Sequence, residues 1–285
     1  MILITGAGTL LGKEISHYMV KKNNKVLSTY YKSSPKKFGN KKLSYFSKIN
    51  LENKITIKHK ISSLIHCASI VPADGLSENK TFTKNIKFFN NLLKVCKKNS
   101  CKNIVLISTI SVYGKFSGII NEKTRINPID AYAKSKLEME NILKNYCKKN
   151  RCNFFILRIP VLLGEGSKNN FLSVILKKIL NDKKIVFSNP NIKLNTFIHV
   201  KTIAKITEYL FLSKFKNLTL NLCAKNNVKL KKVIDQIYSR LKKKRNYSFS
   251  QNTEYFNIST VKLKKYKIPI TSMKQTINLF LDDNV

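Results

Sequence analysis

The fold is decided by the stretch Ile2-Leu3-Ile4-Thr5-Gly6-Ala7-Gly8-Thr9-Leu10-Leu11-Gly12. Its apolar start predicts a short buried strand, the glycines predict a turn, and apolar residues then recur at helical spacing through Met19. A glycine turn between a strand and a helix lets the backbone approach a pyrophosphate, and the helix N-terminus adds free N–H groups and a positive dipole end. We therefore expect dinucleotide contacts from Gly6, Gly8, Thr9, Leu10, Leu11 and Gly12.

The same alternation of strand and helix continues through the first half of the chain. Apolar, β-branched strands are expected at residues 26–30, 43–49, 64–68, 104–108 and 154–159, with helices at 82–95 and 131–146. Such alternation is typical of a parallel sheet that is covered on both faces. The predicted fold class is α/β: a Rossmann-type doubly wound parallel sheet over residues 1–163.

After residue 164 the alternation of strand and helix becomes less regular. Helices are expected at 171–180, 202–212, 230–241 and 273–281, and short strands at 184–187, 196–200 and 219–222. Residues 164–285 are therefore expected to form a smaller α/β substrate lobe over the ends of the sheet. The pattern leaves open whether some of these strands rejoin the main sheet.

The charge of the chain is strongly positive. The 285 residues include 54 Lys and Arg against 15 acidic residues, a net charge of +39, which would attract polyanions. The lysines are scattered, however, and their abundance together with Asn, Ile, Phe and Tyr fits AT-rich codon usage, which argues against a nucleic-acid function. Codon usage explains the lysines better than it explains the scarcity of acids. No apolar run is long enough for a membrane span, and a cytoplasmic location is expected.

Six cysteines are present, and four of them share the pattern Cys-Lys-Lys-Asn-x-Cys, at Cys96 and Cys101 and at Cys147 and Cys152. Each pair falls where a helix should end and a buried strand should begin. A structural metal would need four convergent ligands, and the sequence shows no second half of such a site. We expect reduced, half-buried structural cysteines and no bound metal.

Residues at the end of the second strand bear on the choice of cofactor. An NAD site usually places Asp or Glu there to bind the ribose 2′-OH. Here Tyr30 takes that place, followed by Tyr31, Lys32, Ser33 and Ser34. No carboxylate of this strand would repel a 2′-phosphate, and Lys32 with the serines would attract one. NADP is therefore expected, with NAD as the alternative.

A second pattern points to redox chemistry at an oxygen-bearing carbon. It is Ser108-Thr109-Ile110-Ser111-Val112-Tyr113-Gly114, followed by Tyr132-Ala133-Lys134-Ser135-Lys136. Positions i and i+4 share one face of a helix, so the Lys136 ammonium is expected near the Tyr132 phenol, where it would lower the phenol pKa. Thr109 would hold the same oxygen by a second hydrogen bond. These three groups would move a proton on or off an alcohol or ketone while a hydride moves at the carbon.

Together these segments resemble the extended short-chain dehydrogenase/reductase family, the group of nucleotide-sugar epimerases, dehydratases and reductases. The likeness runs almost from end to end. The matching segments are Ile4 through Gly12, Leu64-Ile65-His66-Cys67-Ala68-Ser69, Asn85, Ser108 through Gly114, Asn127-Pro128 through Tyr132 to Lys136 and Glu140, Leu157-Arg158 with Gly164, Phe197-Ile198-His199-Val200, and Leu263 through Pro269 to Leu281.

The resemblance implies further site residues and an assembly. Additional cofactor contacts would come from Asn50, Leu51, Cys67, Ala68, Ser69, Asn85 and Ser108, besides Tyr132 and Lys136. Substrate contacts would come from Val71, Ser111, Val161, Asn170 and His199. A homodimer would form through the helices expected at 82–95 and 131–146.

This chain also departs from the family pattern, and the departures leave the substrate open. Thr9 stands where the middle glycine is usual. The other departures are Asn50-Leu51 for Asp-Leu, Lys201-Thr202 for Asp-Asp, and Val161 for a polar residue near the sugar.

The reaction can be narrowed by what is missing. Ile110 and Ser111 replace the Asp-Glu pair of the family's 4,6-dehydratases, which argues against dehydration, and Ile110 replaces the Cys of enzymes that combine 3,5-epimerisation with reduction. The expected function is reduction of a 4-keto-sugar nucleotide with Tyr132 as proton donor, as in enzymes similar to dTDP-4-dehydrorhamnose reductase. The alternative is a UDP-sugar 4-epimerase with tightly held NAD. A non-catalytic NADP-binding regulatory protein or an RNA-binding protein on the same fold remains a further alternative.

Overall fold

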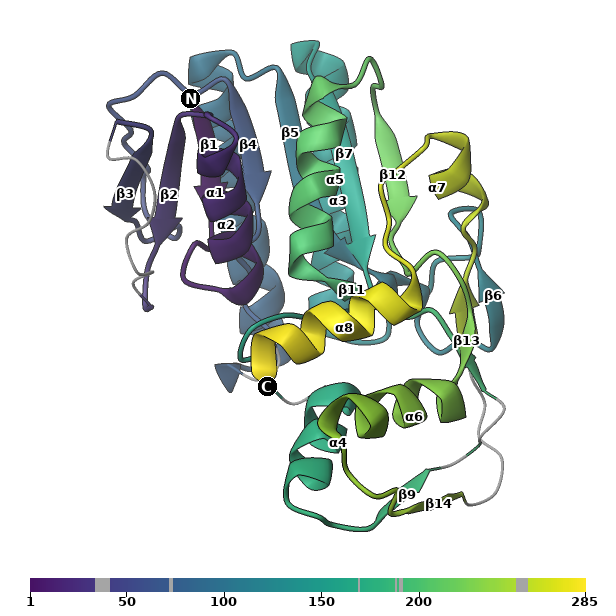
Figure 1. Cartoon of the computed structure of the whole chain (residues 1–285). Helices are drawn as coiled ribbons and strands as arrows, with labels where there is room; N and C mark the ends of the chain where they lie inside the picture. Colours follow the sequence, from purple (N-terminus) through teal and green to yellow (C-terminus); the bar gives the residue numbers. More distant parts are fainter. Residues whose placement is uncertain (34–41, 72–73, 169, 188, 190–191, 250–255) are drawn as a thin grey trace.

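The computed structural model describes residues 1–33, 42–71, 74–168, 170–187, 189, 192–249 and 256–285. A parallel sheet of seven strands lies at its centre (Figure 1). The order across this sheet is β12-β7-β5-β4-β1-β2-β3, so the chain changes direction between β1 and β4, where ligands bind in doubly wound sheets. The strands are β1 (Ile2–Thr5), β2 (Val26–Tyr30), β3 (Ser44–Lys48), β4 (Ser63–His66), β5 (Asn103–Thr109), β7 (Asn153–Ile159) and β12 (Leu218–Asn221).

Two helices cover each face of this sheet. On one face lie α1 (Leu10–Lys21) and α5 (Val200–Leu212), and on the other lie α2 (Glu78–Asn99) and α3 (Ala131–Asn150), as Figure 1 shows. Each face buries its own apolar core. Both α2 and α3 are longer than expected, because Ser77 caps α2 one turn earlier and both helices continue to left-handed residues at Ser100 and Arg151.

These left-handed ends explain the repeated cysteine pattern. The N–H of Cys101 donates to the carbonyl of Cys96 at 3.0 Å, and the N–H of Cys152 donates to that of Cys147 at 3.2 Å. This is the bond that closes a helix through a left-handed residue, and it folds the second cysteine back onto the first. The Cys147 and Cys152 sulfurs lie 2.9 Å apart. All four cysteines are free thiols, as expected, but they are fully rather than half buried.

The C-terminal lobe is built of short elements around a third apolar core. It contains α4 (Phe171–Leu180), α6 (Leu230–Leu241) and α8 (Met273–Asn284), and α8 crosses the carboxyl ends of the main strands (Figure 1). Four two-stranded sheets also form. They pair β8 (Val161–Leu163) with β11 (Phe197–His199), β9 (Ile185–Phe187) with β14 (Tyr247–Phe249), β10 (Lys193–Leu194) with β13 (Val228–Lys229), and β6 (Gly118–Ile120) with β15 (Phe256–Ile258). The remaining elements are the short helices η2 (Ile110–Tyr113) and α7 (Val261–Lys265).

The two halves of the chain are interleaved. β12 pairs in parallel with β7 at the edge of the main sheet, and α5 packs against α1, although both come after residue 164. The expected fold class is confirmed, and the open question about rejoining strands is answered by β12. The boundary at residues 163 and 164 stays a prediction. Within the described ranges, no helix has the length and apolar character needed to cross a bilayer.

Candidate functional site

The glycines around the first turn of the chain lie where a side chain would not fit. Gly6 has φ of +75°, and a Cβ there would lie 2.8 Å from the amide nitrogen of Ala68. At Gly8 a Cβ would lie 2.1 Å from the carbonyl oxygen of Ser33, and at Gly12 it would lie 2.1 Å from that of Gly6. Contacts this short do not occur between real atoms, so the turn requires glycine at all three positions. The three glycines therefore allow the turn to pack closely against Ala68, against Ser33 and against its own start.

Thr9 fits this turn although a glycine is usual at its position. It is the N-cap of α1: its hydroxyl accepts from the Gly12 N–H at 3.3 Å and donates to the Gly6 carbonyl at 2.8 Å. One N–H of the first helical turn is thereby satisfied within the chain. Thr9, in place of the usual glycine, therefore stabilises the start of α1.

A cavity of about 380 Å³ opens beside this turn, at the carboxyl ends of β1, β2 and β4. Its volume is within the range of small-ligand pockets. Among the expected contact residues, the structure brings Gly6, Gly8, Thr9, Tyr30, Lys32, Ser33, Asn50, Leu51, Ala68 and Ser69 together in its lining. The other expected contacts lie outside this lining: Leu10, Leu11, Gly12, Cys67, Asn85, Ser108, Tyr132 and Lys136. Ser34 lies outside the described residues.

Two carboxylates also line the cavity, and the sequence argument missed both. Glu52 accepts a 2.6 Å bond from the Lys84 ammonium, and Asp74 accepts from the Val71 N–H at 2.9 Å. Neither residue belongs to the second strand, so a search of that strand for acids could not find them. The argument that no carboxylate could oppose a 2′-phosphate therefore holds for β2 and not for the whole cavity.

Two expected cofactor contacts turn out to support the site from behind. Asn85 is 1% exposed; its side chain accepts from the Ile70 N–H at 2.8 Å and donates to the Ser135 hydroxyl at 3.0 Å. Ser108 is equally buried, and its hydroxyl donates to Glu140 at 2.6 Å. Each side chain is already bonded inside the protein, and together they fix the loop after β4, the end of β5 and α3. Their contact with a cofactor stays a prediction.

The three candidate catalytic groups lie at the junction of β5 and α3. Thr109 is the last residue of β5, and its hydroxyl donates to the Ser111 hydroxyl at 3.1 Å. Tyr132 lies half-buried in the first turn of α3. The Lys136 ammonium is 5.7 Å from the centroid of the Tyr132 ring and donates to the carbonyl of Ile107, two residues before Thr109, at 2.9 Å. The predicted i, i+4 pair therefore faces the end of β5.

The protonation states differ from the expectation. Burial, with a contribution from Asp130, raises the pKa of Tyr132 to about 12. Burial also lowers the pKa of Lys136 to about 8, against the opposing effects of Cys67 and Glu140. The direction is opposite to the effect expected from Lys136, since removal of the phenol from water raises its pKa and the ammonium is bonded to a backbone carbonyl.

A buried charge network lies behind these groups. Arg158 on β7 binds Glu140 on α3 through two bonds, of 2.6 and 2.9 Å, and both side chains are at most 2% exposed. Arg158 also donates to the Tyr113 hydroxyl at 2.6 Å, and Tyr113 donates to Asn221 on β12 at 2.9 Å. Glu140 and Arg158 were matched to the family motif, but their mutual contact was not expected. The network joins β5, α3, β7 and β12 around the end of β5.

The expected substrate residues do not form one cluster. Ser111 and Val71 are exposed, Val161 is half-buried on β8, and Asn170 caps α4 by accepting from the Ser173 N–H at 3.0 Å. His199 is fully buried, 3.1 Å from an oxygen of Asp283 on α8, and burial lowers its pKa to about 4. We correct the prediction for His199: its ring is enclosed between β11 and α8 and has no surface that could contact a substrate.

The other histidines differ in their burial. His66 is buried in β4, with its Nδ1 atom 2.7 Å from the Thr5 hydroxyl, while His17 and His59 are exposed. No cluster of three or more His, Cys, Asp or Glu residues suited to a metal ion occurs in the part of the chain that the structure describes.

Fold and site together define a dinucleotide-binding α/β protein with a Tyr–Lys pair at the end of a central strand. The model of the NAD dependent epimerase/dehydratase family matches residues 2–223, and the chain therefore belongs to this family.

Two curated relatives and one solved structure show the range of similar proteins. The dTDP-D-glucose 4,6-dehydratase of Dictyostelium discoideum is 28% identical over 71% of this chain, and the UDP-glucose 4-epimerase of Lactobacillus helveticus is 28% identical over 58%. The chain spans about half the length of each, 53% in both cases. The crystal structure of UDP-glucuronic acid 4-epimerase from Bacillus cereus in complex with NAD superposes with a TM-score of 0.81 at 20% identity, covering 99% of this chain and 96% of that one. The chain therefore has the fold of this family over its whole length.

Proposed function

We propose that the protein is an NAD-dependent 4-epimerase of a nucleotide sugar. The observation that carries the proposal is the junction of β5 and α3, where Lys136 is both bonded to the strand that ends at Thr109 and 5.7 Å from the Tyr132 ring. The three-glycine turn and its 380 Å³ cavity lie on the same edge of the sheet. The names of the relatives support this reading, since 4-epimerases occur among both the curated proteins and the solved structures.

The residues present fit a dinucleotide, since a glycine-rich turn leads into the N-terminus of α1 and Gly6, Gly8 and Thr9 line the adjoining cavity. Bound NAD would supply a hydride acceptor that later returns the hydride to the same carbon. Tyr132 would take the proton of the sugar hydroxyl as the carbon is oxidised. It would return the proton after the keto sugar has rotated to present its other face to the cofactor. Thr109 would hold that oxygen. No net oxidation results, because the hydride and the proton both return to the sugar.

Reduction of a keto sugar by NADPH is the second candidate, and two observations favour it. A phenol with a pKa of about 12 is protonated at neutral pH and is ready to donate a proton to a developing alkoxide. The end of β2 carries Tyr30 instead of an acid, and Lys32 and Ser33 line the cavity beside it. The NADP preference is part of this candidate.

One experiment separates the two candidates. The purified protein is incubated with NAD and, in separate reactions, UDP-glucose, UDP-glucuronic acid and UDP-N-acetylglucosamine, and the C4 epimers are followed by proton NMR. We expect interconversion of one pair without net change in cofactor. Absence of interconversion for all three, together with stoichiometric oxidation of NADPH by a 4-keto-sugar nucleotide, would replace the epimerase by the reductase. Tyr132→Phe serves as the inactive control in both assays.

We also propose, from the family resemblance, a homodimer through α2 and α3. Light scattering coupled to size exclusion should give twice the chain mass of 32.8 kDa. A mass equal to one chain at the concentrations of the activity assay would contradict this assembly.

A further inference from the structure

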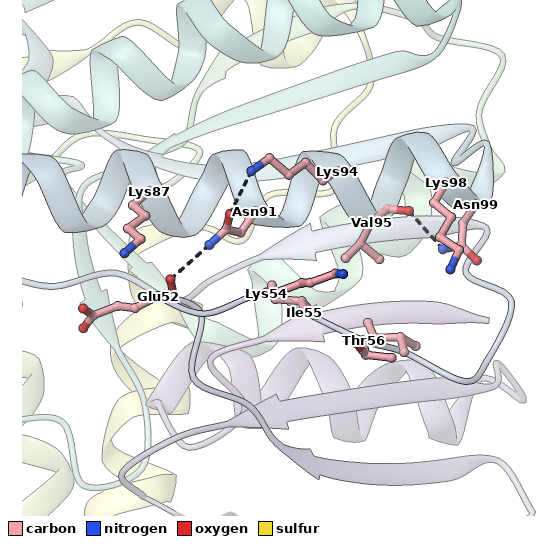
Figure 2. A pocket seen from close by; sticks show the side chains of 11 residues that line it. Glu52, Lys54, Ile55, Thr56, Lys87, Asn91, Lys94, Val95, Lys98 and Asn99 are labelled. Carbon is pink, nitrogen blue, oxygen red and sulfur yellow. Dashed lines mark hydrogen bonds between the residues drawn. The ribbon is translucent and has the colours of Figure 1, made fainter.

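A second cavity lies apart from the one beside the glycine turn. It measures about 470 Å³ and lies between α2 and the segment of residues 52–57 (Figure 2). Glu52 borders both cavities, but the rest of this lining is separate from the dinucleotide cavity. The lining residues are Glu52, Lys54, Ile55, Thr56, Ile57, Lys87, Asn91, Lys94, Val95, Lys98 and Asn99.

The loop wall of this cavity is fixed by side chains of α2. The Asn91 amide donates to the carbonyls of Leu51, Glu52 and Asn53 at 3.0, 3.4 and 3.2 Å. At the far end, the Asn99 side chain accepts from the Ile61 N–H at 3.0 Å. Two asparagines eight residues apart on one helix thus hold both ends of the loop. The cavity is pre-formed, so a ligand would not have to order its walls.

The walls carry an excess of positive charge. Lys87, Lys94 and Lys98 lie on the face of α2 that holds Asn91, and Lys54 approaches from the loop (Figure 2). The row from Lys87 to Lys98 extends about 16 Å along the helix axis. Glu52 is the only carboxylate among the described residues of the lining, and it is already bonded to Lys84 at 2.6 Å. The four lining lysines are therefore the uncompensated charges of the cavity.

An apolar surface lies among these lysines. Ile55 and Ile57 are half-buried and pack against the core that α2 and α3 share with the sheet, and Val95 belongs to that core. A small anion such as a single phosphate would use the charges but leave this surface in water. A ligand that combines several phosphates with a flat, weakly polar ring would use both.

We propose that this cavity binds a nucleotide carrying two or more phosphates, at a site distinct from the dinucleotide site. The lysine row would bind the phosphate chain, and the base would lie against the isoleucines. The extended row of charges matches an extended anion. The loop held by Asn91 and Asn99 provides a second wall, which a lysine cluster on an isolated surface helix would lack.

The test uses ATP as the probe, measured by isothermal titration calorimetry on the full chain with NAD present in excess to fill the dinucleotide cavity. The variant Lys87→Ala/Lys94→Ala/Lys98→Ala removes the row. The matched control Lys231→Ala/Lys232→Ala/Lys274→Ala removes the same charge from exposed positions on α6 and α8. We expect one ATP per chain, affinity weakened at least about tenfold in the first variant, and affinity within about twofold of the parent in the control.

Three outcomes would overturn the proposal. Equal losses in both triple variants would show that ATP responds to net charge alone. Equal affinities of the parent protein for ATP and inorganic tripolyphosphate would show that the base makes no contact. Binding of a short single-stranded RNA that depends on the three lysines, without binding of ATP, would make the cavity part of a nucleic-acid surface instead. Unfolding midpoints of all variants are compared first, so that loss of fold is not read as loss of binding.

Discussion

Tyr132 and Lys136 have opposite responses to the same environment. Burial disfavours the charged form of each, so it raises the phenol pKa to about 12 and lowers the ammonium pKa to about 8. Burial therefore favours the neutral phenol of Tyr132 and the neutral amine of Lys136, in a site where proton transfer is proposed. A phenol that keeps its proton until a charge develops on the substrate oxygen is suited to general acid catalysis.

The first prediction concerns the proton of Tyr132. Tyr132→Phe removes the hydroxyl and leaves the ring in place, so turnover should fall by about two to four orders of magnitude because general acid–base catalysis is lost. Dinucleotide affinity, measured by fluorescence titration, should change less than threefold or so. Turnover within a few-fold of the parent enzyme would reject the role of the phenol.

The second prediction concerns the proton of Lys136. The unfolded chain holds this proton up to a pKa near 10.5, whereas the folded protein releases it near 8. Between these values the unfolded state binds more protons, so the contribution of this residue to stability rises with pH from about 8 to 10.5, by up to about 3 kcal/mol.

Urea unfolding of the parent and of Lys136→Met at intervals from pH 7 to pH 10 measures this effect. The free energy of unfolding of the parent should increase relative to the variant as the pH rises. A difference between the two proteins that is constant over this range would show that the ammonium is not disfavoured by burial.

At the scale of elements, the buried Glu140–Arg158 pair determines how α3 lies on the sheet. It links α3 to β7 directly, to β5 through Ser108 and to β12 through Tyr113 and Asn221. Because Lys136 lies one turn before Glu140 on the same helix, the network also fixes the height of the Tyr–Lys pair over the end of β5.

The third prediction follows from this network. Removing one partner leaves a buried charge unpaired, so Glu140→Leu should lower the free energy of unfolding by about 3–5 kcal/mol. The double variant Glu140→Leu/Arg158→Met should recover much of this loss, because both charges are gone. Chemical denaturation measures both. A double variant that is no more stable than the single one would mean that the pair is not coupled.

The fourth prediction concerns the turn between β1 and α1. A side chain at Gly8 would collide with the Ser33 carbonyl, at 2.1 Å from its Cβ. Gly8→Val should therefore displace the loop after β2 and weaken dinucleotide binding at least about tenfold, since the turn is where the pyrophosphate approaches the backbone. Lys21→Ala, at the far end of α1, is the control and should bind normally. Unchanged affinity of Gly8→Val would place the cofactor elsewhere.

At the scale of the whole molecule, the longer helices and strands were predictable and the shortest strands were not. The strand at residues 26–30 and the helices at 171–180 and 230–241 match the structure residue for residue, because their apolar patterns are local. The strands of two or three residues in the lobe, such as β10 and β13, carry too short a pattern to be recognised. They exist because distant segments pair.

The same distinction between local and tertiary information applies to the site. The glycine turn and the Tyr–Lys spacing are local and were readable from the sequence. The burial of His199 against Asp283, the use of Asn85 and Ser108 as supports, and the entry of Glu52 and Asp74 into the cavity depend on contacts across the fold. The pKa of Tyr132 also depends on how deeply α3 is packed, which spacing cannot reveal.

The central claim is that the glycine turn and the groups Thr109, Tyr132 and Lys136 serve one redox site. A crystal structure of the protein with NAD and a UDP-sugar tests this most directly. We predict the pyrophosphate against Gly6 and Gly8, with the Thr109 and Tyr132 hydroxyls both within hydrogen-bond distance of one sugar oxygen. A complex in which the sugar binds away from Tyr132, or in which the two hydroxyls contact different parts of the ligand, would contradict the account.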